Sequence, residues 1–319
     1  MSASRVASVL KGVVGRLSRA VDLGARESAR RYRRAVRHLD SGRRALVDVD
    51  SRGLGGTLAP GMLHGRPWVY RPSAAEAAMA GRRMVEPVEF TGKMVFDVLE
   101  ARGIVRKMRS DDGALNIYKP TRGELTENVE WYWETRGAQT NREIAAYRFD
   151  EILGFGRIPP TARTQGVAGD DKTSGPGMIQ QFVESTESRD VVDYPRAQRH
   201  QLAVLDYVMG NRDRHWANFR TVERDGQPEI VAIDHGWCFP ITEGPFEVPT
   251  KSPFVIERLI DDGPLDPDVL AAVRAVDTDK LRAAWDDAGL EPGAINGAFA
   301  RLAKVQELGD IPKDARWDF

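Results

Sequence analysis

Two stretches near the middle of the chain carry apolar residues at the spacing of an α-helix. In residues 140–153 the apolar positions share one helical face, and Gly154 follows as a stop signal. Residues 196–209 show the same pattern, with Gly210 directly after them. The sequence therefore predicts two helices, each ended by a glycine.

Shorter apolar runs separated by turn residues predict strands. Residues 103–108 and 115–118 form one predicted hairpin around a Ser-Asp-Asp-Gly turn. Residues 219–222 and 229–233 form a second, with Asp225-Gly226 in the turn. Further strands are predicted at 158–161 and 177–184, and further helices at 90–102, 253–260, 265–276, 278–288 and 292–306.

The composition is that of a globular chain. Of 319 residues, 41% are hydrophobic and 29% are charged, and the formal net charge of -1 argues against a dedicated nucleic-acid-binding protein. The one cysteine, Cys238, excludes an internal disulfide and a cysteine-based zinc site. No apolar run approaches the roughly 18 residues that span a bilayer, and no continuous apolar segment near the N-terminus marks a secretory signal. We therefore expect a cytoplasmic protein without a transmembrane segment.

The beginning of the chain is strongly basic. Residues 1–44 hold 12 Lys and Arg against three acidic residues. We expect either an arm that binds an acidic partner, such as nucleic acid or anionic lipid, or a solvated leader. Residues 51–65 are rich in glycine, and we interpret them as a flexible linker. Residues 53–56 lack the Gly-Lys-Ser/Thr ending of a phosphate-binding loop.

Candidate chemistry gathers in residues 206–236. Asp213 and Asn218 lie five positions apart on one predicted loop before the second hairpin, and Asp234 follows that hairpin. An antiparallel hairpin returns the chain to its starting point, so we expect Asp234 beside Asn218. Phosphoryl transfer needs a carboxylate next to the acceptor hydroxyl, and oxygen ligands for a metal against the phosphates. The sequence therefore predicts Asp213 as the base and Asn218 with Asp234 as Mg²⁺ ligands.

The motif DRHWAN at residues 213–218, followed by IDHG at residues 233–236 and then Phe239, resembles the phosphatidylinositol 3- and 4-kinase superfamily. The resemblance is closer to a small bacterial phosphatidylinositol-kinase-like branch; ordinary protein kinases carry His-Arg-Asp and Asp-Phe-Gly instead. It covers roughly residues 103–306. It implies an α+β, two-lobed protein-kinase-like fold, with a basic extension at 1–85, a β-rich N-lobe at 86–184 and a helical C-lobe at 185–319.

The resemblance also assigns roles in the N-lobe. The sequence YKPTRGE, which contains Lys119, resembles the same branch, so Lys119 is expected to hold the phosphates of ATP. Glu143 is expected either to orient Lys119 through an ion pair or only to close the helix start, as the last member of a capping box that begins at Thr140. Adenine is expected to bond to the backbone of a hinge formed by Gln181, Phe182 and Val183.

Other polar residues near the motif have secondary expected roles. His215 and His235 are expected to contact the transferring phosphoryl group or to order the loop. Asp206 is expected to support the loop by hydrogen bonds. Glu130 and Glu134 are lesser candidates for the Lys119 partner.

The predicted function is ATP- and Mg²⁺-dependent transfer of phosphate to a hydroxyl of a protein or small molecule. Residues 241–252 contain no basic cluster, which disfavours a phosphoinositide acceptor. Three alternatives remain open. They are a kinase-fold enzyme that transfers AMP or another group, a catalytically dead kinase-like binding module, and a nucleic-acid- or envelope-binding protein that acts through its basic arm.

Overall fold

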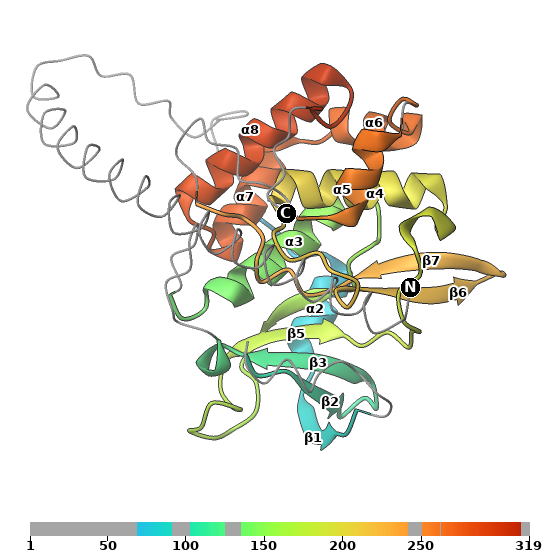
Figure 1. Cartoon of the computed structure of the whole chain (residues 1–319). Coiled ribbons are helices and arrows are strands. Elements are labelled where there is room, and N and C mark those ends of the chain that lie inside the picture. Colours follow the sequence, from blue (N-terminus) through green and yellow to red (C-terminus); the bar gives the residue numbers. More distant parts are fainter. Residues whose placement is uncertain (1–68, 91–102, 125–134, 242–250, 262, 314–319) are drawn as a thin grey trace, which may run out of the picture. The chain divides into compact units, whose positions relative to one another are not determined.

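The computed structural model describes residues 69–90, 103–124, 135–241, 251–261 and 263–313 (Figure 1). All of them belong to the second of the two units into which the chain divides, residues 63–318. Several expectations fall outside the described residues: the basic arm at 1–44, the glycine-rich segment at 51–65, nearly all of the helix at 90–102, both Glu130 and Glu134, and most of the segment 241–252.

A five-stranded antiparallel sheet forms the N-lobe, with the order β1-β2-β3-β5-β4. The first predicted hairpin is confirmed, because β2 pairs with β3 and Gly113 donates its N–H to the Ser110 carbonyl at 2.9 Å in the turn. The strands are β1 Met84–Val88, β2 Arg106–Ser110, β3 Leu115–Pro120, β4 Thr161–Thr164 and β5 Gly177–Gln181, and a short 3₁₀ turn, η2 Thr121–Gly123, follows β3.

Two helices pack on this sheet. Helix α2, Ala74–Gly81, contacts β4 and β5, and α3, Ala138–Leu153, contacts the same two strands. The predicted domain boundary between residues 85 and 86 cuts β1, and α2 lies ahead of it. The described part of the N-lobe therefore starts within the segment that was assigned to the basic extension.

The start of α3 corrects one prediction. The helix begins at Ala138 after Gly137, so Thr140 and Glu143 are interior residues and the capping-box alternative for Glu143 is wrong. The physical reason is Glu124, whose carboxylate accepts the N–H groups of Gly137 at 2.7 Å and of Thr140 at 2.8 Å. A carboxylate from outside the helix thus satisfies donors that the first turn leaves open.

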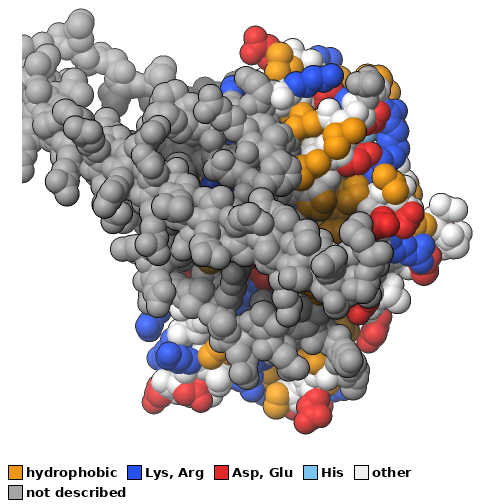
Figure 2. Space-filling view, viewed as in Figure 1, with side chains coloured by type: hydrophobic (Ala, Val, Ile, Leu, Met, Phe, Trp, Pro, Cys, Tyr) orange, Lys and Arg blue, Asp and Glu red, His pale blue; other side chains and the backbone are white. Residues whose placement is uncertain are grey.

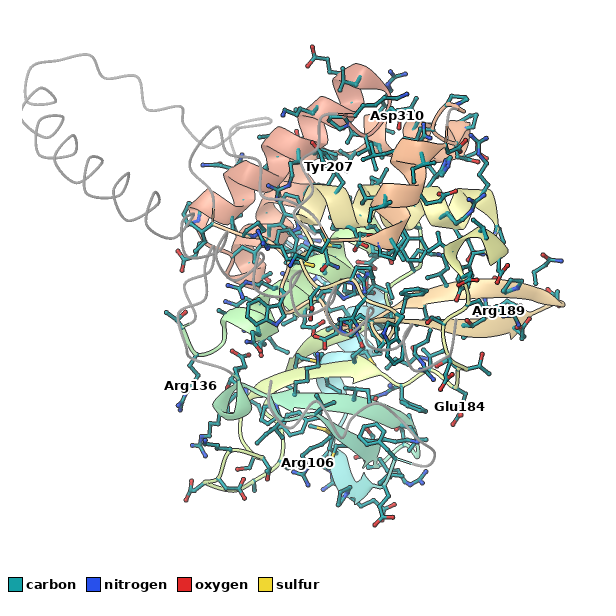
Figure 3. All side chains as sticks on the ribbon, in the orientation of Figure 1. Arg106, Arg136, Glu184, Arg189, Tyr207 and Asp310 are labelled. Atoms are coloured by element: carbon teal, nitrogen blue, oxygen red, sulfur yellow. The ribbon has the colours of Figure 1, made fainter. Side chains whose placement is uncertain are left out.

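The second predicted hairpin is also confirmed. Strand β6, Phe219–Arg224, pairs with β7, Gln227–Ala232, around Asp225 and Gly226, which have φ of 52° and 76°. Positive φ at both turn residues suits the twist of a tight hairpin. The chain after β5 runs along β6, where Thr186 bridges Thr221. Arg189, labelled in Figure 3, forms an ion pair with Glu223.

Helices form the C-lobe around α4, Arg196–Met209, which ends at Gly210 in the left-handed conformation as predicted. Trp285 is fully buried and contacts the rings of Phe149, Phe239 and Phe299, so one aromatic cluster joins α3 to the later helices. The remaining elements are η3 Val191–Asp193, α5 Pro253–Ile260, α6 Pro267–Arg274, α7 Thr278–Ala288 and α8 Pro292–Leu308.

The architecture is therefore a β-rich lobe followed by a helical lobe, and the predicted α+β class is confirmed. In Figure 1 the sheet lies below and helices α4 to α8 lie above, with α3 between them. On the face shown in Figure 2, acidic and basic side chains are interspersed over the described surface. No helix within the described ranges is both long and apolar enough to cross a membrane.

Candidate active site

Two adjoining cavities lie where the two lobes meet. The larger has a volume of about 310 Å³ and the smaller about 120 Å³. Both are lined by Lys119 from β3 and by Asp234 from the end of the β6–β7 hairpin. Asp213, His215 and Glu143 line the larger cavity. Asn218 lines the smaller one, together with the predicted hinge residues Gln181, Phe182 and Val183.

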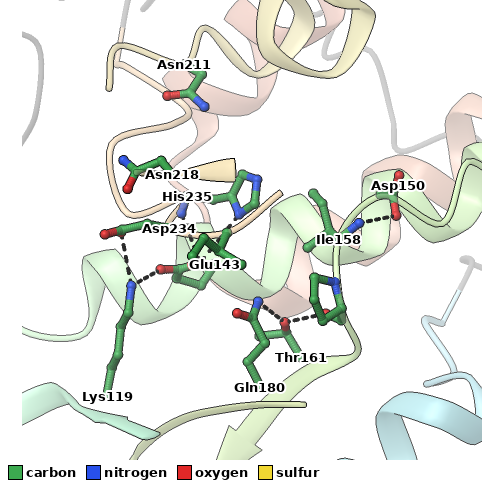
Figure 4. A network of polar contacts seen from close by, with 12 residues as sticks. Lys119, Glu143, Asp150, Ile158, Thr161, Gln180, Asn211, Asn218, Asp234 and His235 are labelled. Atoms are coloured by element: carbon green, nitrogen blue, oxygen red, sulfur yellow. Dashed lines mark hydrogen bonds and ion pairs between the residues drawn. The ribbon is translucent and has the colours of Figure 1, made fainter. Parts of the chain in front are cut away.

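Lys119 lies between two carboxylates (Figure 4). Its Nζ is 2.6 Å from Oε1 of Glu143 and 3.0 Å from Oδ1 of Asp234. Burial alone would lower the pKa of Lys119, but the charges of Asp234 and Glu143 outweigh it and raise that pKa above its usual value. Burial alone would raise the pKa of Glu143, but Lys119 holds it well below its usual range. Lys119 and Glu143 are therefore both charged near neutral pH.

The position of Lys119 on β3 is fixed by the close pairing of β3 with β5. Gly177 lies opposite Pro120 in the sheet, and a Cβ on Gly177 would stand only 2.2 Å from the carbonyl oxygen of Lys119. Only glycine permits this approach. The strand that carries the lysine is therefore fixed against its neighbour at this point.

The β6–β7 hairpin brings Asp234 back to Asn218, as predicted. The N–H of Ile233 donates to the carbonyl of Asn218 at 3.0 Å, so the two candidate ligands flank a single backbone hydrogen bond. Asp234 has φ of 58°, a conformation that costs free energy for a residue other than glycine. The backbone turns away from Asn218 at Asp234, and the Asp234 carboxylate contacts Lys119.

Asp213 occupies a loop that other polar groups hold in shape. Its N–H donates to Oδ1 of Asn211 at 2.9 Å, and its carbonyl accepts from Nδ2 of Asn218 at 2.7 Å. The Asp213 side chain is about a quarter exposed and lines the larger cavity, where Nε2 of His215 lies 3.9 Å from Oδ2. Asp213 can therefore receive a proton from a hydroxyl in that cavity.

The donor set fits a magnesium ion. The Asn218 amide uses its nitrogen on the Asp213 carbonyl, which leaves Oδ1 as its ligand atom, and Asp234 contributes a carboxylate. Mg²⁺ prefers such oxygens, takes few of them from the protein and keeps waters or phosphates as its other ligands. Within the described ranges, no group of three or more His, Cys, Asp or Glu is arranged to hold a metal.

The hinge segment lines the smaller cavity, but part of its backbone is already used. The N–H of Gln181 donates to Pro160 at 2.9 Å, and the N–H of Phe182 donates to Leu115 at 3.1 Å. The ammonium of Lys107 lies 4.1 Å from the centroid of the Phe182 ring. Of the three predicted hinge residues, Val183 is thus the one whose N–H these sheet contacts leave for a ligand.

A buried hub behind the loop joins residues whose connection the sequence did not reveal. Arg214 and Asp206 are fully buried and form an ion pair, with Nη2 of Arg214 3.0 Å from Oδ1 of Asp206. Nη1 of Arg214 donates to the carbonyls of Asn218 and Ile233, the residues that begin and end the hairpin. Asp206 was expected to support the loop by hydrogen bonds, and it accepts from Asn211 and Arg214. The sequence feature that could have identified Arg214 is its place between Asp213 and His215 in the motif.

Glu124 is a second residue whose role went unrecognised. It belongs to the motif around Lys119, yet its contact is with the first turn of α3. Burial raises its pKa, although the N–H and hydroxyl donors around it oppose that shift. Lys119 and Glu124 thus attach both ends of one short segment to α3, the helix that carries Glu143.

Part of the chain is similar to known proteins. Residues 157–261 match the family model described as phosphatidylinositol 3- and 4-kinase. Phosphatidylinositol 4-kinase gamma 4 of Arabidopsis thaliana is 34% identical over 119 residues, which cover 31% of this chain and 21% of that protein. Phosphatidylinositol 4-kinase gamma 3 of the same plant is 31% identical over 125 residues, 31% of this chain and 22% of that protein. The chain thus spans about a fifth of the length of these curated relatives.

Solved structures give more distant matches. A golgi casein kinase is 16% identical, and the match covers 72% of this chain and 73% of that kinase, with a TM-score of 0.49. A Helicobacter pylori proinflammatory kinase is 13% identical, and the match covers 73% of this chain and 94% of that kinase, with a TM-score of 0.43. The resemblance to phosphatidylinositol 3- and 4-kinases inferred from residues 213–218 and 233–236 is confirmed by the family model, which spans those two motifs.

Proposed function

We propose that this chain, whose residues 157–261 match the phosphatidylinositol 3- and 4-kinase family, is an ATP- and Mg²⁺-dependent kinase. The observation that carries the proposal is the position of Lys119 between Glu143 and Asp234 at the junction of two cavities. A lysine aimed at phosphates by one carboxylate, beside a second carboxylate that binds metal, is the arrangement that phosphoryl transfer uses. The need for ATP also favours a cytoplasmic location.

The nucleotide would lie with its base in the smaller cavity and its phosphates near Lys119. Val183 offers a backbone N–H to the base, and apolar side chains such as Val105 and Ile117 line the same space. The Lys119 ammonium would neutralise phosphate oxygens while Glu143 holds it in place. Asn218 and Asp234 would hold Mg²⁺, which supplies charge neutralisation at the β- and γ-phosphates when it is bound.

The acceptor hydroxyl would enter the larger cavity beside Asp213. Its oxygen forms a bond to the γ-phosphorus while the bond from that phosphorus to the β-phosphate bridging oxygen breaks, and ADP leaves. The hydroxyl proton passes to the Asp213 carboxylate. His215 lies within reach of the same carboxylate and is 44% exposed, so it is placed to order the loop or contact the transferred group.

We propose a protein or small molecule as the acceptor rather than a phosphoinositide. Within the described lining of the larger cavity, Lys119 is the one Lys or Arg side chain, and it is engaged by two carboxylates. An inositol phosphate headgroup favours several Lys or Arg side chains. The names of the relatives point to phosphatidylinositol, which makes a lipid acceptor the second candidate.

The proposal is tested by transfer of label from ATP into candidate acceptors. We expect label from γ-labelled ATP but not α-labelled ATP in the product, and at least a hundredfold less with Asp234→Ala because a metal ligand is lost. Asp193→Ala, at an exposed position that lines neither cavity, is the matched control.

Other outcomes identify the alternatives. Transfer of the α-labelled group would make the enzyme an AMP transferase. ATP binding without any transfer would make the chain a binding module. Equal labelling by wild type and Asp234→Ala would refute the kinase assignment. Vesicles of phosphatidylinositol, assayed beside protein acceptors, decide between the two acceptor classes.

A further inference from the structure

The fully buried side chain of His235 lies directly behind Glu143. Its backbone N–H donates to Oε2 of Glu143 at 3.0 Å, and its ring Nδ1 lies 3.6 Å from the same oxygen (Figure 4). Lys119 occupies the other oxygen, Oε1. The Glu143 carboxylate is therefore held between the phosphate-binding lysine on one side and residue 235 on the other.

The protonation of the His235 ring follows from its second contact. Nε2 lies 2.9 Å from Nη2 of Arg214, and a guanidinium can only donate. Nε2 is therefore the acceptor, and the neutral ring carries its proton on Nδ1, facing Oε2 of Glu143. Within the described residues Nδ1 has no hydrogen-bond partner, and Oε2 of Glu143 lies 3.6 Å from it, just beyond hydrogen-bond distance. The buried N–H dipole of the ring thus faces the Glu143 carboxylate.

Arg214, which donates to the His235 ring, is itself held by several buried partners. Its guanidinium is bound to Asp206 and to the backbone carbonyls at both ends of the β6–β7 hairpin. Asp206 in turn accepts the hydroxyl of Ser252 at 2.7 Å. The His235 ring therefore connects Glu143 on α3 to a buried hub that also fixes the backbone at Asn218 and Ile233.

This connection matters when the nucleotide binds. Lys119 has two carboxylate partners, and one of them, Asp234, would also be a metal ligand. Glu143 would then hold the ammonium while phosphate oxygens replaced Asp234. We propose that His235 is a positioning residue that keeps Glu143 in place during this exchange, so that Lys119 reaches the phosphates in one fixed geometry. This inference rests on the proposed function.

The test compares two substitutions of His235 that keep different halves of the ring. His235→Gln can still accept from Arg214 but lacks the Nδ1–H, and we expect it to raise the KM for ATP about tenfold. His235→Asn places an amide N–H near the Nδ1 position, and we expect it to recover most of that loss. Steady-state kinetics against ATP, with nucleotide binding measured separately, give KM and kcat for each variant.

His200 provides a matched control in the same chain. It is fully buried on α4, its Nδ1 accepts the N–H of Asp266 at 2.9 Å, and its Nε2 has no hydrogen-bond partner within the described residues. It lines neither cavity. We expect both His200→Gln and His235→Gln to lower the unfolding temperature, and His200→Gln to leave the KM for ATP unchanged.

A double-mutant cycle with Glu143→Gln identifies the route of the effect. If His235 acts through Glu143, His235→Gln adds little further loss once Glu143 is neutral. Independent, additive losses would overturn the inference, as would an unchanged KM in folded His235→Gln. A wild-type chain that transfers no phosphate would instead overturn the proposed function, and this inference with it.

Discussion

Asp213 and Asp234 are both carboxylates at the same cavity, but their surroundings give them different chemistry. Asp234 forms an ion pair with Lys119, on the side of the site where we propose that phosphate and metal bind. Asp213 has the half-exposed His215 as its cavity-side neighbour at 3.9 Å and faces the larger cavity. A group that receives a proton must be reachable by the hydroxyl, and Asp213 meets this condition.

We therefore expect Asp213→Asn to lower kcat by a factor of about 10² to 10⁴ while the affinity for ATP stays within about twofold. The amide keeps the size of the side chain but cannot take the proton. Asp225→Asn, the same chemical change in the exposed β6–β7 turn, is the control. Rapid-quench kinetics with direct ATP-binding measurements check this. A rise in the ATP dissociation constant equal to the fall in kcat would show that Asp213 binds nucleotide instead.

At the scale of elements, α3 is positioned by carboxylates at both of its ends. Glu124 satisfies the first turn, and Asp150 near the last turn accepts the N–H groups of Arg157 at 3.2 Å and Ile158 at 2.9 Å. Asp150 thereby ties the end of α3 to the chain that leads into β4. Helix α3 carries Glu143, so these two attachments help to set the position of Glu143 beside Lys119.

Asp150 also makes the free energy of unfolding depend on pH. Burial raises its pKa to about 6, above the usual value of 3.8, although two backbone N–H groups oppose that shift. Between these values the folded chain binds more protons at this residue than the unfolded chain does, so its contribution to stability falls as pH rises from about 4 to about 6 and is constant above. We expect Asp150→Asn to lack this decline.

Urea unfolding of wild type and Asp150→Asn at several pH values between 4 and 7 measures the effect. The difference in unfolding free energy between the two chains should shift in favour of the variant as pH rises through this range and then stay level. The amide substitution also alters the two hydrogen bonds, which adds an offset that does not depend on pH. A difference that is flat from pH 4 to 7 would show that Asp150 titrates normally.

The elements themselves were predicted from the sequence because their signals are local. Helix α4 matches residues 196–209, and the β6–β7 hairpin formed around Asp225-Gly226, because periodicity and turn chemistry act over a few residues. The contact of Lys119 with Glu143 was predicted because a motif marked the lysine. Glu124 at the start of α3, and His235 between Arg214 and Glu143, were not predicted. Buried polar contacts between distant residues leave no period in the sequence.

At the scale of the whole described unit, Arg148 connects the two lobes. It is almost fully buried on α3, and its guanidinium forms a bidentate contact with Glu76 on α2, with Nη2 2.7 Å from Oε1. Nη1 of the same side chain lies 2.8 Å from Asp287 and 2.8 Å from the carbonyl of Ala284, both on α7. One guanidinium thus bridges the sheet side and the helical side of the site.

We expect Arg148→Met to destabilise the fold by about 3–5 kcal/mol, because it leaves the buried Glu76 carboxylate without its positively charged partner. Adding Glu76→Gln should restore much of that loss, since the uncompensated charge is then removed and methionine retains part of the apolar packing. Urea unfolding of the two single variants and the double variant measures this coupling. The surface pair Arg83 and Asp111, with side chains 78% and 45% exposed, is the control, and Arg83→Met should cost less than about 1 kcal/mol. If Arg148→Met cost no more than Arg83→Met, the lobes would be held by the aromatic cluster around Trp285 and not by this guanidinium.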